Sequence, residues 1–200
     1  MDVDSVMRYL GVFEDKTTKN QRDSPLLRLP AELRNKIYDY VCSDTQLLDE
    51  FFIEAFDAPE LKAVECTHVA ILVDTTDVTK LTSPTHAPVQ QDLSYPFLGW
   101  NLDDLVKFAW QFDGAEHGIV GTEFVIMDEQ TLEDKTVILV TPSEGYDSVQ
   151  TAPRLTARSD FRSSLITLNV KSMGVGGDEP WEEAAEQGGR VIRLYDEKSV

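Results

Sequence analysis

Two short apolar runs, separated by a polar segment, constrain the fold of this 200-residue chain more than any other feature. Residues 123–128 and 136–141 are rich in β-branched and aliphatic side chains and are short enough to be strands. The residues between them, 129–135, are polar, which indicates a connection longer than a tight hairpin turn. The sequence therefore predicts an antiparallel pair of strands joined by a polar turn.

Other segments after residue 66 predict further strands and helices around this pair. Residues 68–74 form a short, β-branched apolar run that is typical of a buried strand. Residues 75–96 are polar and predict a long loop, and residues 101–112 have the spacing of a helix with Asn101 as its N-cap. We also predict a strand over 154–158, a short helix over 179–186 and a final strand over 191–195, whereas 161–173 fit helix or strand equally well. This order predicts an α+β or α/β fold with a mixed sheet.

The N-terminal third has a helical pattern instead. Residues 1–23 are predicted to be an N-terminal arm and polar linker. After Pro30, the residues Leu33, Ile37 and Val41 recur every four positions, which places them on one face of a short helix. Residues 47–56 carry a second apolar face, rich in phenylalanine, at helical spacing. We interpret that second face as core, with an exposed docking face as the alternative.

The first of these helices carries a recognisable motif, Leu29-Pro30-x-Glu32-Leu33-x-x-x-Ile37-x-x-Tyr40-Val41. Over about residues 24–42 it resembles the opening of an F-box, in the F-box-like form common in fungal proteins. An F-box usually continues into a Val-x-[Arg/Lys]-x-Trp segment, which this chain lacks. The resemblance implies a helical module over residues 24–62 that docks on the Skp-type adaptor of a cullin-RING ubiquitin ligase. The partner-binding residues that it implies are Leu29, Pro30, Leu33, Ile37, Tyr40 and Val41.

The remaining residues, 63–200, are predicted to form an α/β domain, which would present a client protein to that ligase. Residues 124–129 and 134–140, with Arg158, Phe161 and residues 181–183, resemble a domain family of bacteria and fungi. The resemblance covers about residues 95–195 and implies no known activity.

The charge of the chain limits its partners. With 36 acidic and 18 basic residues the formal net charge is −18, which argues against nucleic acid or an anionic membrane as a partner. Two cysteines, Cys42 and Cys66, are too few for a disulfide scaffold. The acidic N-terminus does not resemble a signal peptide, and no apolar run reaches the ~20 residues of a membrane span. We therefore expect a cytoplasmic or nuclear protein.

No group of residues carries the spacing of a known catalytic or metal site. The three histidines lie far apart, and Asp128 and Glu129 are adjacent, which suits a turn better than a paired-carboxylate site. The glycine-rich residues 174–177 are followed by two acidic residues, which would repel a phosphate. The three arginines at 154, 158 and 162 are predicted to form internal ion pairs. We thus predict no catalytic residue, no cofactor and no metal.

Three interpretations of function remain after this reading of the sequence. The first is a protein-interaction module of the F-box-like kind. The second is a domain whose motif helix belongs to its own core. The third is a small ligand-binding or enzymatic domain with its site in the long loops.

Overall fold

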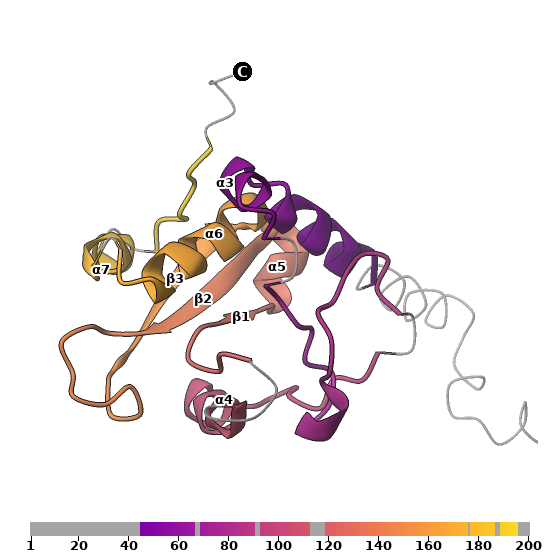
Figure 1. The fold of residues 1–200 in the computed structure, drawn as a ribbon, viewed down its shortest axis with the longest axis horizontal. Helices are drawn as coiled ribbons and strands as arrows, with labels where there is room; N and C mark the ends of the chain where they lie inside the picture. The colour runs from indigo at the N-terminus through magenta and orange to yellow at the C-terminus, as the bar shows by residue number, and fades with distance from the viewer. Residues whose placement is uncertain are drawn as a thin grey trace, which may run out of the picture. The chain divides into compact units, whose positions relative to one another are not determined.

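The computed structural model describes residues 45–66, 69–90, 93–112, 119–175, 177–186 and 189–195. At their centre is an antiparallel sheet in the order β1-β2-β3, formed by Phe124–Ile126, Thr136–Pro142 and Arg154–Asp160 (Figure 1). Val125 lies opposite Leu139, and Leu139 lies opposite Ala157. The predicted strand pair and the predicted strand over 154–158 are therefore confirmed, and helices together with this sheet make the fold α+β.

The segment between β1 and β2 is a short helix, α5 (Glu129–Asp134), where we had predicted a polar turn. Its N-terminus is closed by a capping box, in which Thr131 N–H donates to Asp128 Oδ1 at 3.1 Å and Asp128 N–H donates to Thr131 Oγ1 at 3.0 Å. Lys135 ends it in the left-handed conformation, with φ of 56°. The capping-box hydrogen bonds give partners to backbone N–H groups that have none inside the helix, which allows so short a helix to form.

Three further helices follow or precede the sheet. The ambiguous segment 161–173 is a helix, α6 (Phe161–Ser172), whose N-cap Asp160 accepts a hydrogen bond from Ser163 N–H at 2.8 Å. The predicted helices are confirmed as α4 (Leu102–Ala109) and α7 (Glu179–Glu186). The predicted cap is also confirmed, since Asn101 Oδ1 accepts from Asp104 N–H at 2.9 Å. A 3-10 turn, η3 (Trp110–Phe112), extends α4.

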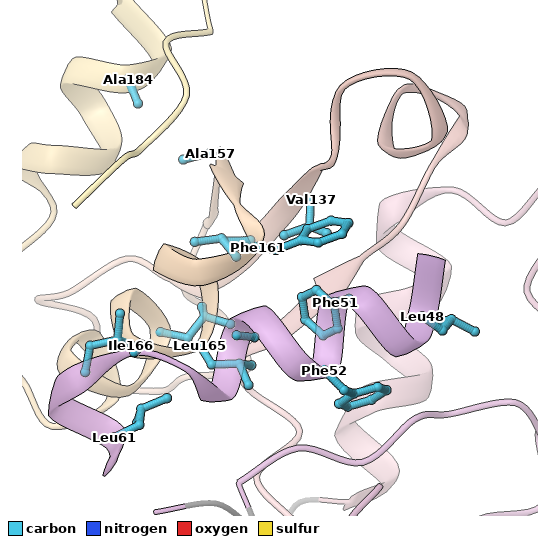
Figure 2. Close-up of a cluster of buried hydrophobic side chains, with 14 of the residues drawn as sticks. Leu48, Phe51, Phe52, Leu61, Val137, Ala157, Phe161, Leu165, Ile166 and Ala184 are labelled. Atoms are coloured by element: carbon cyan, nitrogen blue, oxygen red, sulfur yellow. The ribbon is translucent and has the colours of Figure 1, made fainter. Parts of the chain in front are cut away.

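The main hydrophobic core lies between the sheet, α6 and the helical residues 45–56, which are followed by α3 (Pro59–Ala63). Phe51 and Phe161 meet edge to face there, with ring centroids 5.3 Å apart (Figure 2). The interpretation of the phenylalanine-rich face as core is thus confirmed. The buried hydrophobic side chains of residues 45–63 are Leu48, Phe51, Phe52, Ala55, Ala58 and Leu61.

The packing of residues 45–63 in the main core affects the prediction of a separate helical module over residues 24–62. The compact unit of the described residues begins at Thr45, because the helix over 45–56 and α3 share their core with the sheet. The last part of that segment therefore packs with the α+β domain. Residues 24–44 and the arm 1–23 lie outside the described residues.

A second, smaller core contains Leu81, Phe108 and Phe112. Residues 69–75 lie between the two cores, since Ala70 and Leu72 pack against the first and residues 71 and 73 against the second. The prediction of a strand over 68–74 is nevertheless wrong for its described part, which has no regular secondary structure. Its described backbone hydrogen bonds are made with Thr85, whose N–H donates to Ala70 O at 3.0 Å and whose hydroxyl accepts from Leu72 N–H at 2.8 Å. The residues therefore alternate between the two cores, but within the described part of the chain no strand pairs with them.

Two other segments complete the comparison with the predicted elements. The predicted loop over 75–96 is irregular in its described residues, apart from the 3-10 turn η2 (Val78–Lys80). The predicted final strand over 191–195 is reduced to a single parallel bridge between Ile192 and Ser159. The chain leaves the sheet after this bridge, because Leu194 N–H donates to the Ser163 hydroxyl at 2.9 Å.

Gly121 is the glycine whose size matters most to this fold. A Cβ atom at this position would lie 2.0 Å from the carbonyl oxygen of Ala109, at the end of α4. We expect Gly121→Ala to lower the free energy of unfolding by about 1–3 kcal/mol, the usual cost of overpacking. Denaturant unfolding checks this, with Val120→Ala at the exposed neighbouring position as the control. If the two variants unfold alike, the close approach of residues 109 and 121 does not exist.

Candidate interaction surface

The partner-binding residues predicted from the F-box-like motif all precede Thr45. Leu29, Pro30, Leu33, Ile37, Tyr40 and Val41 lie outside the described residues. Their role therefore stays a prediction, and the site is sought here on the α+β domain.

The first polar cluster on the domain surrounds Arg158. Its guanidinium forms an ion pair with Asp128 and donates to the Thr136 hydroxyl at 3.0 Å. Burial raises the pKa of Asp128, but the hydrogen bonds from Arg158 and Thr131 outweigh it and hold that pKa below its usual range. Because Asp128 also caps α5, this cluster fixes the α5 turn to β3, and we assign it a structural role.

The second polar cluster surrounds Lys171, whose side chain is only 4% exposed. Its ammonium group donates to Asp178 at 2.5 Å, to Glu144 at 2.8 Å and to the Gly177 carbonyl at 2.9 Å. Asp178 also accepts from the Ser143 hydroxyl at 2.5 Å. All three ammonium donors are used. The cluster therefore ties α6 to the loop after β2 and to the start of α7, and leaves no free amine for chemistry.

Arg162 and Arg154, the other two arginines of the predicted cluster, differ in their surroundings. Arg162 lies 3.7 Å from the Asp57 carboxylate and 4.8 Å from the centre of the Tyr195 ring. Burial lowers the pKa of Arg154, while the nearby Glu123 carboxylate opposes that shift. The predicted internal ion pairs are therefore confirmed for Arg158 and Arg162.

An open groove with a volume of about 310 Å³ lies beside the helix over 45–56. Its apolar part includes Ile53, which is 61% exposed, and Phe56, which lies 6.3 Å from the His86 ring. Asp57 and Lys62, which form an ion pair, line it as well. The complete lining is Phe52, Ile53, Phe56, Asp57, Lys62, His86 and Ala87. Such a groove suits an apolar side chain of another protein better than a small polar substrate.

A second exposed apolar feature is the turn over residues 95–100, which we call the aromatic turn. Leu98 at its tip is 89% exposed, and Tyr95 and Trp100 on either side are also exposed. Phe97 holds the turn in place, since its ring lies 4.8 Å from that of Phe108 in the second core. Tyrosine and tryptophan are enriched at protein-binding surfaces, so this turn is a candidate for one.

Sequence reasoning missed both surfaces. The groove combines side chains from a helix and from a loop that is about thirty residues further along the chain. The aromatic turn had a visible signal, its composition, but exposure cannot be inferred from aromatic content because such residues are more often buried.

Other tests of the domain's function add little. Within the described residues, no group of three or more His, Cys, Asp or Glu side chains is arranged to hold a metal ion. None of the helices in that part of the chain is long and apolar enough to cross a membrane. Comparisons with protein-family models, with curated proteins and with solved structures find no match to the chain.

Proposed function

We propose that this chain is a protein-interaction module. In this proposal, the F-box-like stretch docks on the Skp-type adaptor of a cullin-RING ubiquitin ligase, and the α+β domain presents a client protein. The observation that carries it is the motif Leu29-Pro30-x-Glu32-Leu33 with Ile37 one turn further on. A cytoplasmic or nuclear site of action, where such ligases work, belongs to the same proposal.

The chemistry of the domain supports binding over catalysis. In its two polar clusters, Arg158 bonds to Asp128 and Thr136, and all three ammonium donors of Lys171 are used within the domain. Among its exposed apolar side chains, Ile53 lines the groove, and Tyr95, Leu98 and Trp100 lie on the aromatic turn. These are the features through which a domain binds another protein.

The packing of residues 45–63 in the domain core limits which residues can dock on the adaptor in this proposal. An F-box is a small helical module, but here the helix that follows the motif gives its apolar face to the domain core. In the proposal, adaptor contact is therefore made by the motif stretch before Thr45, and the helix over 45–56 belongs to the client-binding domain.

Ile37→Asp tests the docking role. If the stripe formed by Leu33 and Ile37 contacts the adaptor, a carboxylate at 37 must be desolvated in the complex, which costs several kcal/mol. We expect capture of purified adaptor to be lost while cooperative melting of the chain is retained. The matched control is Lys36→Asp, which adds the same group on another face of the predicted helix and should retain capture.

Two outcomes would contradict this proposal. Retained capture by Ile37→Asp would remove this stripe from the docking surface. Collapse of the whole protein would show that the motif helix belongs to the domain's own core, which is the second interpretation of the sequence.

A further inference from the structure

We propose that the outer edge of β3 binds an extended segment of a client protein, in the place that residues 191–195 occupy in this structure. We call residues 191–195 the edge segment and the place that they occupy its seat. The inference rests on the proposed function in taking the α+β domain to bind a client, and it deepens that proposal by naming how the client is held.

The edge segment lies on β3 as a short added strand. The strand order β1-β2-β3 leaves β3 at an edge of the sheet. Ile192 N–H donates to Arg158 O at 2.7 Å, and Ile192 O accepts from Asp160 N–H at 3.2 Å. These two bonds form the parallel bridge between Ile192 and Ser159. A sheet edge is a template for pairing with an extended chain, and here the structure shows one such chain in place.

The hydrogen bonds of the seat are made with the backbone of its occupant. Besides the two bonds to β3, the Ser159 hydroxyl donates to Ile192 O at 3.3 Å, and Leu194 N–H donates to the Ser163 hydroxyl at 2.9 Å. Both serines are fully buried. Because each of these bonds uses an N–H or C=O that every extended chain carries, apart from the N–H missing in proline, a segment of another protein can form them equally well.

Two side chains of the edge segment define which sequences suit the seat. Ile192 and Tyr195 pack against the main core, whereas Leu194 is 54% exposed. The centre of the Tyr195 ring lies 4.8 Å from the guanidinium of Arg162, and the Tyr195 hydroxyl donates to the Glu60 carboxylate. In strand addition, backbone bonds give affinity and side-chain contacts give specificity. The occupant that we infer is therefore a client segment with a branched apolar residue and a tyrosine three positions later.

The edge segment is held by few contacts, so a client can displace it. It pairs with β3 through a single bridge, and the bond from Tyr195 to the exposed Glu60 holds its last residue. Gly189 precedes it with a φ of 89°, a left-handed conformation that glycine adopts without strain. Segments with few buried contacts open at a lower cost than core strands. Since the edge segment belongs to the same chain, it competes with a client at a high effective concentration.

Binding of a labelled peptide to the full chain tests the proposal. The probe is residues 189–195 with blocked ends, and fluorescence polarisation measures its affinity. Tyr195→Phe in the chain keeps a ring beside Arg162 but removes the bond to Glu60, which makes the edge segment easier to displace. We expect this variant to bind the peptide at least about threefold more tightly than the unaltered chain. The matched control is Tyr146→Phe, at an exposed tyrosine outside the seat, which should bind like the unaltered chain.

Methylation of the peptide backbone tests whether the peptide binds as the edge segment does. A methyl group on the Leu194 nitrogen removes the donor to the Ser163 hydroxyl and keeps every side chain. We expect it to weaken binding to the Tyr195→Phe chain at least about threefold. The control is methylation of the Arg193 nitrogen, which donates no hydrogen bond within the described residues and should have a smaller effect.

Several outcomes would overturn the proposal. They are equal peptide binding by the unaltered and Tyr195→Phe chains, no effect of methylation at Leu194, and dimerisation of the Tyr195→Phe chain, which would assign the opened seat to a second copy. A large fall in the melting temperature of that variant would show that the edge segment is a fixed part of the fold. Capture of purified adaptor should be unchanged by Tyr195→Phe, so a failure of adaptor docking is observed separately.

Discussion

Replacing Phe161 by alanine is expected to remove about 3–5 kcal/mol from the free energy of unfolding, the usual cost of truncating a buried phenylalanine. Phe161 is fully buried at the junction of β3 and α6. Its ring meets Phe51 edge to face, so the truncation would leave a cavity between the sheet and the helix over 45–56 (Figure 2). Denaturant unfolding at neutral pH measures the loss.

A matched control and a double-mutant cycle make this prediction specific. Tyr146→Ala removes a ring of similar size from an exposed position and should change stability by less than about 0.5 kcal/mol. Combining Phe51→Ala with Phe161→Ala should cost less than the sum of the two, because an edge-to-face pair contributes about 0.5–1.5 kcal/mol beyond area burial. Strict additivity would show that residues 45–56 do not pack against α6 and the sheet.

The sequence predicted the centre of this fold better than its periphery. The strands over 124–126 and 136–142 were predictable because a short β-branched run is a local property, and the strand over 154–160 was predictable from the alternating faces of residues 154–158. The prediction of a strand at residues 68–74 was wrong for a different reason. Their apolar pattern indicates burial on both sides, but a strand also needs backbone hydrogen bonds to a neighbouring strand, and the pattern does not predict those. The helix α6 was ambiguous because Phe161, Ser164, Leu165 and Ile166 are buried on several sides, which erases an amphipathic period.

The candidate surfaces depend on contacts that no local pattern encodes. The groove exists only because residues 86 and 87 return to the helix over 45–56. The Lys171 cluster likewise joins residues 143–144 and 178 to the end of α6, and only its Lys171–Asp178 part is close in sequence. The sequence shows which residue types are present, but only tertiary packing brings these side chains into contact.

Lys171→Met is the second substitution for which we expect a large effect. It keeps most of the apolar stem but removes the cation that neutralises Asp178, whose side chain is largely buried. Breaking a buried ion pair by removing one partner costs about 3–5 kcal/mol, and we expect a loss at the lower end because Glu144 stays exposed to water. The matched control is Lys107→Met, in an exposed pair with Asp104, where the change should stay below about 1 kcal/mol.

The pH dependence of this loss separates the ion pair from simple packing. Burial raises the pKa of Asp178, but the hydrogen bonds from Lys171, Ser143 and Glu144 N–H outweigh it, so that the folded-state pKa is lowered. A lowered pKa adds stability above the unfolded value of about 3.9, and that stability is lost as the pH falls through the folded value. Without Lys171, burial should instead dominate and raise the pKa of Asp178.

The difference in stability between the unaltered chain and Lys171→Met should therefore be full at neutral pH and should narrow as the pH falls. The narrowing begins above about pH 3.9, where Asp178 of the variant takes up its proton, and ends below that value, where Asp178 of the unaltered chain does so. On the alkaline side the pKa of Lys171 is raised, although its burial lowers it, because Asp178 and Glu144 stabilise the ammonium form. Its contribution is then present below about pH 10.4 and is lost only above that value. Unfolding curves from about pH 2 to about pH 12 measure this profile. A difference that stays constant into acid would mean that the loss does not come from the ion pair with Asp178, since proton uptake by that carboxylate would then have no effect.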